Sequence, residues 1–327
     1  MRKLQRISAL YFWILVFSGL WMVSSIGFQD EISVTSFNNK TITTNMIPLA
    51  SSLHPNLDDS ITTTTKTQSP TKWAVLIAAS GGESYWHHEI LEKHDIRDLK
   101  MILLDHGWEK DHIHCFLEEE ATTDAIMNTS FEWLNSNGAD EDDLIVYSFN
   151  MHGYYLPTDI PPIDEPDGKD EFICPWDPTV NGWNINTYIV DDDLAARFKT
   201  LKSNNIVLIF DTCHSGGMID GSSDLGCSGR VVLTSCDEDE ASGMFIARLH
   251  WLFPYYLIQG LTGHADLNND GFVSAEEALK YTEEPVAFRS TIFNRLFNQQ
   301  VPTQHPQLYD GWPSMENNTE ELKLIEL

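Results

Sequence analysis

Short apolar runs recur along this chain, and stretches with helical spacing separate them. The runs are WAVLIAAS (73–80), HIHCFL (112–117), LIVYSF (144–149), IVLIF (206–210) and RVVLTS (230–235). Apolar residues recur at helical spacing from His88 to His106, and further helices are predicted from Thr122 to Asn135 and from Asp192 to Lys202. Strands joined through helices pair in parallel, with helices on both faces of the sheet. The pattern therefore predicts an α/β fold, completed after Gly243 by a helical stretch, an acidic loop and two short helices.

The N-terminal part predicts export. Arg2, Lys3 and Arg6 precede the uncharged stretch Ile7–Phe28, which is the layout of a secretory signal peptide. Its 22 residues would also suit a retained membrane anchor, so both readings stay open. Residues 29–71 are rich in Ser, Thr and Asn and predict a disordered tether. We therefore expect a secreted or extracytoplasmic protein, with residues 1–28 as targeting segment and a folded domain over residues 72–327.

The chain is strongly acidic. Its 20 basic and 49 acidic residues give a formal net charge of −29. Nucleic-acid binding needs a basic footprint, so this class of function is excluded. The charge suits calcium, cationic peptides or solubility alone. Five cysteines are an odd number, which leaves at least one free thiol in an exported protein, and Cys213 is the best candidate for it.

Two of the predicted strands end at residues that are capable of nucleophilic catalysis. IVLIF runs into DTCHSGG with Cys213, and LIVYSF runs into NMHG with His152. Ligands of open α/β sheets bind at the carboxyl ends of strands, where this thiol and imidazole would meet. A cysteine attacks as its thiolate and needs a base, which histidine supplies near neutral pH. The pattern indicates a cysteine hydrolase; the alternative is a buried core thiol with an unrelated surface histidine.

These motifs resemble those of the caspase–hemoglobinase superfamily of cysteine peptidases (clan CD), and most closely those of the metacaspases. The family order of motifs is followed by NMHG, DGKDE (167–171), IVDDDL (189–194), DTCHSGG and VVLTSCDEDEAS (231–242). The resemblance implies a caspase-like three-layer sandwich around a mostly parallel six-stranded sheet. It implies polypeptide substrates, His152 as general base and acid, and Cys213 as nucleophile. The backbone amides of Gly153 and Cys213 would form the oxyanion hole.

The resemblance also implies an acidic pocket for the substrate side chain at position P1. Asp211, two residues before the nucleophile, and Asp95, in the first helix, match the acidic positions of metacaspases. Such a pair would hold the cationic end of Arg or Lys. Asn150 stands where the family usually has serine, which alters the shape of the pocket. Legumains cleave after Asn and favour an acidic residue after the nucleophile, so His214 points away from them. A legumain-like Asn- or Asp-specific peptidase remains an alternative, as does an inactive calcium-binding interaction module.

Two calcium sites are expected. DLNNDGFVSAEE (266–277) matches the calcium loop of an EF-hand, with Gly271 at the turn. The ligands in that loop would be Asp266, Asn268, Asp270, Phe272, Ser274 and Glu277. The metacaspase resemblance implies a second site, made by Asp170, Asp191, Asp192 and Asp220. Converging carboxylates repel one another unless a cation neutralises them.

These sites predict a Ca²⁺-stimulated peptidase. The stretch from His214 to Gly229 contains no Lys or Arg, so an enzyme specific for basic residues would not cleave itself there. We expect a monomer with a single-chain catalytic domain that reaches a membrane only through its N-terminal segment.

Overall fold

The computed structural model describes residues 70–80, 86–176, 187–220, 225–299, 301–314 and 320–327. The targeting segment 1–28 and the tether, apart from its last two residues, lie outside these ranges. Within the described ranges, no helix is both long and apolar enough to cross a membrane.

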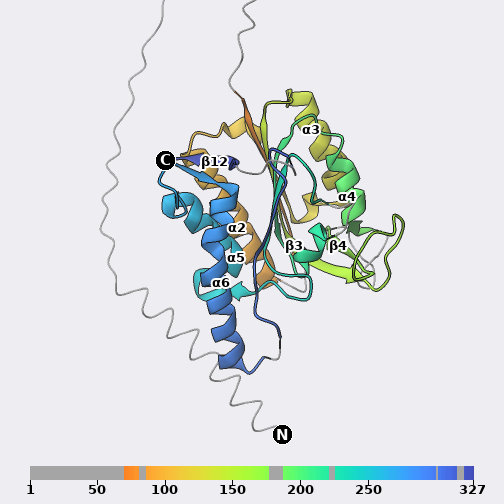
Figure 1. The fold of residues 1–327 in the computed structure, drawn as a ribbon, viewed down its shortest axis with the longest axis vertical. Helices are drawn as coiled ribbons and strands as arrows, with labels where there is room; N and C mark the ends of the chain where they lie inside the picture. The colour runs from red at the N-terminus through yellow and green to blue at the C-terminus, as the bar shows by residue number, and fades with distance from the viewer. Residues whose placement is uncertain (1–69, 81–85, 177–186, 221–224, 300, 315–319) are drawn as a thin grey trace, which may run out of the picture. The chain divides into compact units, whose positions relative to one another are not determined.

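A sheet runs through the centre of the domain (Figure 1). Its six main strands have the order β11-β7-β6-β3-β1-β2. Every neighbouring pair is parallel except β11 with β7. The main strands are β1 (Lys72–Ala79), β2 (Ile113–Leu117), β3 (Leu144–Leu156), β6 (Asn205–Asp211), β7 (Arg230–Thr234) and β11 (Gln307–Asp310). The predicted mostly parallel sheet is thus confirmed, and its sixth strand comes from the C-terminal QLYD.

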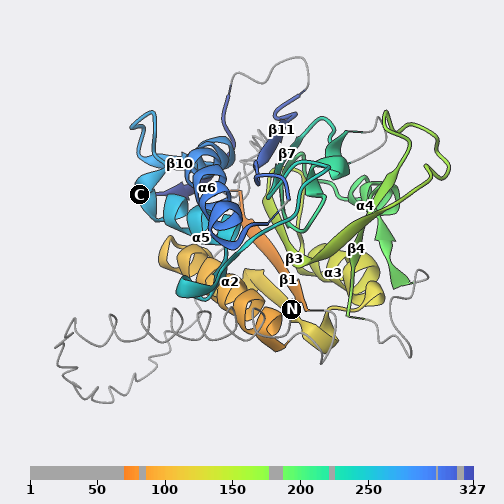
Figure 2. The same ribbon diagram turned by 90° about the horizontal axis from the view of Figure 1, so that it is seen from below.

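Helices cover both faces of this sheet, as Figures 1 and 2 show from two directions. One face carries α2 (Trp86–Asp105), α5 (Leu252–Gln259) and α6 (Ala275–Phe297), and the other carries α3 (Ser130–Asn137) and α4 (Asp191–Phe198). The side chains of β1 alternate between two separate cores: Ile77 packs with Phe198 in one, and Leu76 packs with Leu257 in the other. Because strand side chains alternate in direction, a continuously apolar strand serves both cores. The three-layer α/β sandwich is confirmed.

Several helices differ from their predicted bounds. The helix expected from Thr122 is a π-helical turn (Ala125–Thr129) that leads into the short α3. The prediction of two short helices near the C-terminus is wrong, because α6 is a single helix of 23 residues that continues through Pro285. Proline removes one intrahelical hydrogen bond. The helix continues because its buried face, including Leu279 and Val286, packs against the domain on both sides of the proline.

Short strands complete the structure around the main sheet. β4 (Asp170–Cys174) pairs antiparallel with the far half of β3, and β5 (Ile189–Val190) pairs with β4. β8 (Met244–Phe245) and β9 (His250–Trp251) form a hairpin before α5. β10 (Phe272–Ser274) pairs with the C-terminal strand β12 (Lys323–Glu326). β4 pairs with β3 at His152, whereas Glu326 of β12 lies near Lys72, at the opposite end of the sheet.

Candidate active site

The structure brings Cys213 and His152 to the same edge of the sheet. Asn150 of β3 is paired in parallel register with Asp211 of β6, so each candidate lies two residues beyond this pair. The Cα atom of Gly153 packs against Thr212 and Cys213, in the turn that follows β6 and carries the candidate nucleophile (the nucleophile turn). A Cβ atom at Gly153 would lie 2.7 Å from the carbonyl oxygen of Cys213. Real Cβ contacts are not this short, so the approach requires glycine, and it brings the backbone that follows His152 against the backbone of the cysteine.

A buried chain of contacts orients the imidazole of His152. Burial lowers the pKa of His152, whereas a hydrogen bond with the backbone of Ser80 raises it. Because this bond favours the protonated ring, the ring N–H donates to the carbonyl of Ser80. Oε2 of Glu118 accepts hydrogen bonds from Ser80, at 2.7 Å from Oγ and 3.3 Å from the backbone N–H. Glu118 is buried and has a φ of +54°, which is costly for a residue other than glycine.

The thiol of Cys213 requires a base. Burial raises the pKa of the thiol, and a hydrogen bond from the backbone N–H of Ser242 lowers it. Burial is the larger effect, so the resting group is a thiol that needs a base to become the thiolate. The next residue, His214, has a φ of +60°, and its backbone N–H donates to the carbonyl of Glu240 at 2.9 Å. The loop that follows β7 therefore supports the turn that carries the nucleophile.

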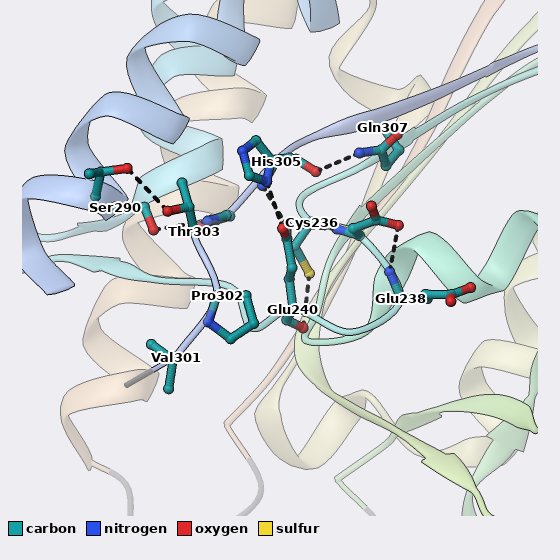
Figure 3. Close-up of polar contacts among 12 residues, drawn as sticks. Cys236, Glu238, Glu240, Ser290, Val301, Pro302, Thr303, His305 and Gln307 are labelled. Carbon is teal, nitrogen blue, oxygen red and sulfur yellow. Dashed lines mark hydrogen bonds and ion pairs between the residues drawn. The ribbon is translucent and has the colours of Figure 1, made fainter. Parts of the chain in front are cut away.

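The C-terminal segment fixes this supporting loop in turn (Figure 3). The carboxylate of Glu240 accepts from the backbone N–H and from Nδ1 of His305, both at 2.6 Å. The side chain of Gln304 is buried; it donates to the carbonyl of Ser235 at 2.8 Å and accepts from the backbone N–H of Gly243 at 2.9 Å. Sequence reasoning assigned no role to these residues, since they lie more than 60 positions from the residues they contact.

The three predicted pocket residues, Asp95, Asn150 and Asp211, line one pocket. Its other walls are largely apolar and include Leu99 and Leu257. Oδ2 of Asp95 accepts a hydrogen bond from Nδ2 of Asn150 at 3.1 Å. Asp95 is only 2% exposed, so it is a buried carboxyl at the wall of a pocket.

Asp211 has an unused oxygen. Its Oδ1 accepts a hydrogen bond from the hydroxyl of Ser242 at 2.5 Å, while its buried Oδ2 has no hydrogen-bond partner among the described residues. Burial raises the pKa of Asp211 to about 8, and the nearby charge of Asp95 acts in the same direction. At neutral pH the carboxyl is therefore mostly protonated until a cation arrives beside it.

Glu92 is a third buried carboxyl in this region, and sequence reasoning missed it. It lies on α2, three residues before Asp95, and is 1% exposed. Burial raises its pKa well above the ordinary value, and the charges of Glu118, Asp211 and Asp95 add to this effect. Its spacing of three from Asp95 places both residues on one helix face, which was the one available signal.

A second acidic group lies beside β4. Glu165, Asp170 and Asp191 are buried, and one oxygen from each lies within 4.8 Å of the others. Asp170 and Asp191 were predicted, whereas Glu165 was missed. Asp192 is close by: burial and the charges of Asp164 and Asp170 raise its pKa to about 6. Asp220 was predicted as a ligand but is not in this group. Its charge, after burial, raises the pKa of Glu238.

The EF-hand-like loop has the turn that its motif predicts. The backbone N–H of Asp270 donates to Oδ1 of Asp266 at 3.1 Å and to Oδ1 of Asn268 at 2.8 Å, and Gly271 has a φ of +84°. Phe272 and Ser274 lie in β10, which pairs with β12. Glu277 lies in the first turn of α6 and accepts from the backbone N–H groups of Leu267 and Asn268 at 2.9 and 3.0 Å, and from that of Ser274 at 3.1 Å. Nζ of Lys323 lies 2.8 Å from Oδ2 of Asp270.

Comparisons with known proteins match this region. Residues 84–222 match the family model of the metacaspase peptidase C14 domain. Metacaspase-1 of Lodderomyces elongisporus is 31% identical over 136 residues and metacaspase-1 of Candida albicans is 29% identical over 136 residues, each match covering 38% of this chain and 29% of the relative. Metacaspase-1 of Pyricularia oryzae is 31% identical over 135 residues, 38% of this chain and 32% of the relative. The chain thus spans about 30% of the length of these curated relatives.

Among solved structures, protein GSU0716 of Geobacter sulfurreducens is similar at a TM-score of 0.49 and 17% sequence identity, covering 73% of this chain and 93% of its own. The region matched by the family model contains His152, the acidic residues Asp170 and Asp191, and Cys213. The resemblance to metacaspases is thereby confirmed for the part of the chain that carries the catalytic candidates.

Proposed function

We propose that this chain is a cysteine endopeptidase with Cys213 as nucleophile and His152 as general base and acid. The observation that supports the proposal is the packing of Gly153, the residue after His152, against the backbone of Cys213. His152 removes the thiol proton, and the thiolate attacks the substrate carbonyl carbon. The carbonyl of Ser80 stabilises the imidazolium that forms.

The remaining steps use the same groups. The backbone N–H groups of Gly153 and Cys213 receive the oxyanion, and the imidazolium of His152 protonates the leaving amine. Water then attacks the thioester with His152 again acting as base, which regenerates the thiol. Hydrolysis of peptides by the wild type and its loss in Cys213→Ala, with the circular dichroism spectrum unchanged, is the expected result. Unchanged hydrolysis in Cys213→Ala would contradict the assignment of the nucleophile.

We propose Arg or Lys as the P1 residue. The support comes from buried acceptors in the pocket, since Oδ2 of Asp211 and Oδ1 of Asn150 both lack hydrogen-bond partners among the described residues. Glu92, which is not among the pocket-lining residues, is a third buried carboxyl close enough for the charges of Asp211 and Asp95 to raise its pKa in addition to burial. An arriving guanidinium supplies several N–H donors and favours the ionised form of Asp211.

The test of P1 preference is a panel of fluorogenic peptides that differ only at P1. We expect cleavage after Arg and Lys. Cleavage after Asn but not after Arg would support the legumain-like alternative, and absence of cleavage after every residue would support the interaction module.

We propose that calcium stimulates the enzyme through Glu165, Asp170 and Asp191, with Asp192 beside them. Three buried carboxylates whose oxygens lie within 4.8 Å suit the oxygen ligands that Ca²⁺ prefers. β4, which begins at Asp170, pairs with β3 at His152. The next residue in β4 is Glu171, and its carboxylate packs closely on Gly217, four residues after Cys213. A Cβ atom added to Gly217 would overlap the carboxylate of Glu171.

An ion that orders the start of β4 would therefore order both sides of the active site. We expect higher activity in millimolar calcium than in excess chelator, and equal rates would contradict this proposal.

We propose a separate calcium site in the loop 266–277. The turn at Gly271 gathers the side-chain oxygens of Asp266 and Asn268. Strand β12 pairs with β10 within the loop, and the ammonium of Lys323 occupies one oxygen of Asp270. Calcium would have to displace this ammonium. A rise in melting temperature on adding calcium to a variant whose site beside β4 is disabled would support this second site.

We further propose that residues 1–28 direct export, so that the peptidase acts outside the cytoplasm as a monomer. N-terminal sequencing of protein from the natural host would show whether the segment is removed. Recovery of the full-length chain from the cytosol alone would contradict export, and the mass measured by light scattering would test the monomer.

A further inference from the structure

One basic side chain of this protein already contacts a carboxylate at the wall of the pocket. Nδ1 of His250, in β9, donates to Oδ1 of Asp95 at 2.5 Å. The other ring nitrogen, Nε2, lies 3.5 Å from Oδ2 of Asp98. Each ring nitrogen of His250 thus faces a carboxylate. His250 is 11% exposed at its side chain, so this ion pair is largely shielded from water.

This contact leaves Asp95 with no free oxygen. Oδ1 is used by His250, and Oδ2 accepts hydrogen bonds from the backbone N–H of Trp251 and from Nδ2 of Asn150, both at 3.1 Å. His250 thus forms an ion pair with one of the carboxylates that line the pocket. The imidazole ring therefore already makes the contact with Asp95 that a basic P1 side chain would make.

We propose that His250 is an internal counter-ion of the P1 pocket, which competes with an Arg or Lys side chain of the substrate for Asp95 and so sets the affinity for basic P1 residues. The inference rests on the proposed P1 preference and adds a residue to it. His250 acts through Asp95 and does not itself touch the substrate. With His250 in place, Asp211 supplies the free carboxyl oxygen, and the imidazolium weakens the hold on the P1 cation.

The variant His250→Gln separates this role from a purely structural one. The glutamine amide retains an N–H donor for Asp95 but carries no charge. His94→Gln is the matched control, because His94 lies on α2 with its ring 6.1 Å from that of His250, and no described hydrogen bond joins it to Asp95. The substrates are two otherwise identical peptides with Arg or citrulline at P1, since citrulline has the shape of Arg without its charge.

The proposal predicts a lower KM for the Arg peptide in His250→Gln, by roughly tenfold, with kcat nearly unchanged. The citrulline peptide and the His94→Gln control should show little change. A structural role would instead change both peptides equally, together with a lower melting temperature. Equal effects on both peptides, or no effect on the Arg peptide, would overturn the proposal.

A binding measurement keeps this test independent of catalysis. Fluorescently labelled peptides that end in Arg or citrulline are titrated against Cys213→Ala and against the double variant with His250→Gln, and anisotropy gives Kd. Roughly tenfold tighter binding of the Arg peptide alone supports the role of His250. No gain for the Arg peptide, or no binding of it to either protein, overturns that role. If cleavage assays show no activity after Arg or Lys, the proposed function fails, and this comparison still decides the role of His250.

Discussion

Asp211 makes the stability of this protein depend on pH in a way that can be measured. Burial raises the pKa of its carboxyl from 3.8 to about 8. In the unfolded chain the group ionises near pH 4, whereas in the folded protein it keeps its proton to about pH 8. The folded state therefore binds more protons between these values, so the stability that the neutral carboxyl contributes is lost as pH rises towards about 8.

The size of the effect follows from linkage. Each pKa unit corresponds to about 1.36 kcal/mol, so between pH 5 and 7.5 Asp211 lowers the free energy of unfolding by about 3 kcal/mol. Asp211→Asn removes the ionisation and keeps a side chain of the same shape that can still bond Ser242. Urea denaturation at both pH values gives the change in the free energy of unfolding with pH for the variant and for its parent. Both proteins carry Cys213→Ala, which prevents self-cleavage. We expect the variant to lose about 3 kcal/mol less than its parent over this range.

Asp211→Asn with Cys213 intact should be a poor enzyme. Loss of one partner of a buried charge pair costs about 2–5 kcal/mol, which is a reduction of roughly 30- to 5000-fold in kcat/KM for the Arg peptide. The citrulline peptide should change much less, because no charge is left unpaired. Equal pH slopes in the two proteins would refute the reasoning, since they would mean that Asp211 is already ionised in the folded state at pH 5.

Three further predictions follow from the geometry of the site. Gly153→Ala should cost about 1–3 kcal/mol of stability and abolish most activity, because its Cβ atom would overlap the nucleophile turn, whereas Gly138→Ala strains a left-handed turn away from the site and should leave kcat unchanged. His152→Gln should lower kcat by about 10²–10⁴-fold with the fold retained, and a kcat equal to the wild type would exclude it as the base. Asp191→Asn should remove calcium stimulation but keep calcium-induced thermal stabilisation, and Asp266→Asn should do the reverse; identical behaviour of the two variants would mean that there is one site.

Much of the fold can be predicted from short segments of the sequence. Five of the six main strands are continuous apolar runs, and their length and the helical spacing between them predict a parallel sheet covered on both faces. The sixth, β11, is short and half-exposed, so no pattern marks it. The helix through Pro285 was missed for a related reason, since packing of its buried face offsets the local effect of proline.

The sequence by itself determined which residues are the candidates for catalysis. Cys213, His152 and Asp211 stand at the ends of apolar runs, and the topology of a parallel sheet gathers such ends at one edge. Tertiary structure alone decided what surrounds them: Glu118 accepts hydrogen bonds from Ser80, and His250 donates to Asp95. These contacts join residues that are 38 to 155 positions apart. Local spacing carries no information about them, because charge pairing and burial depend on which segments the fold places together.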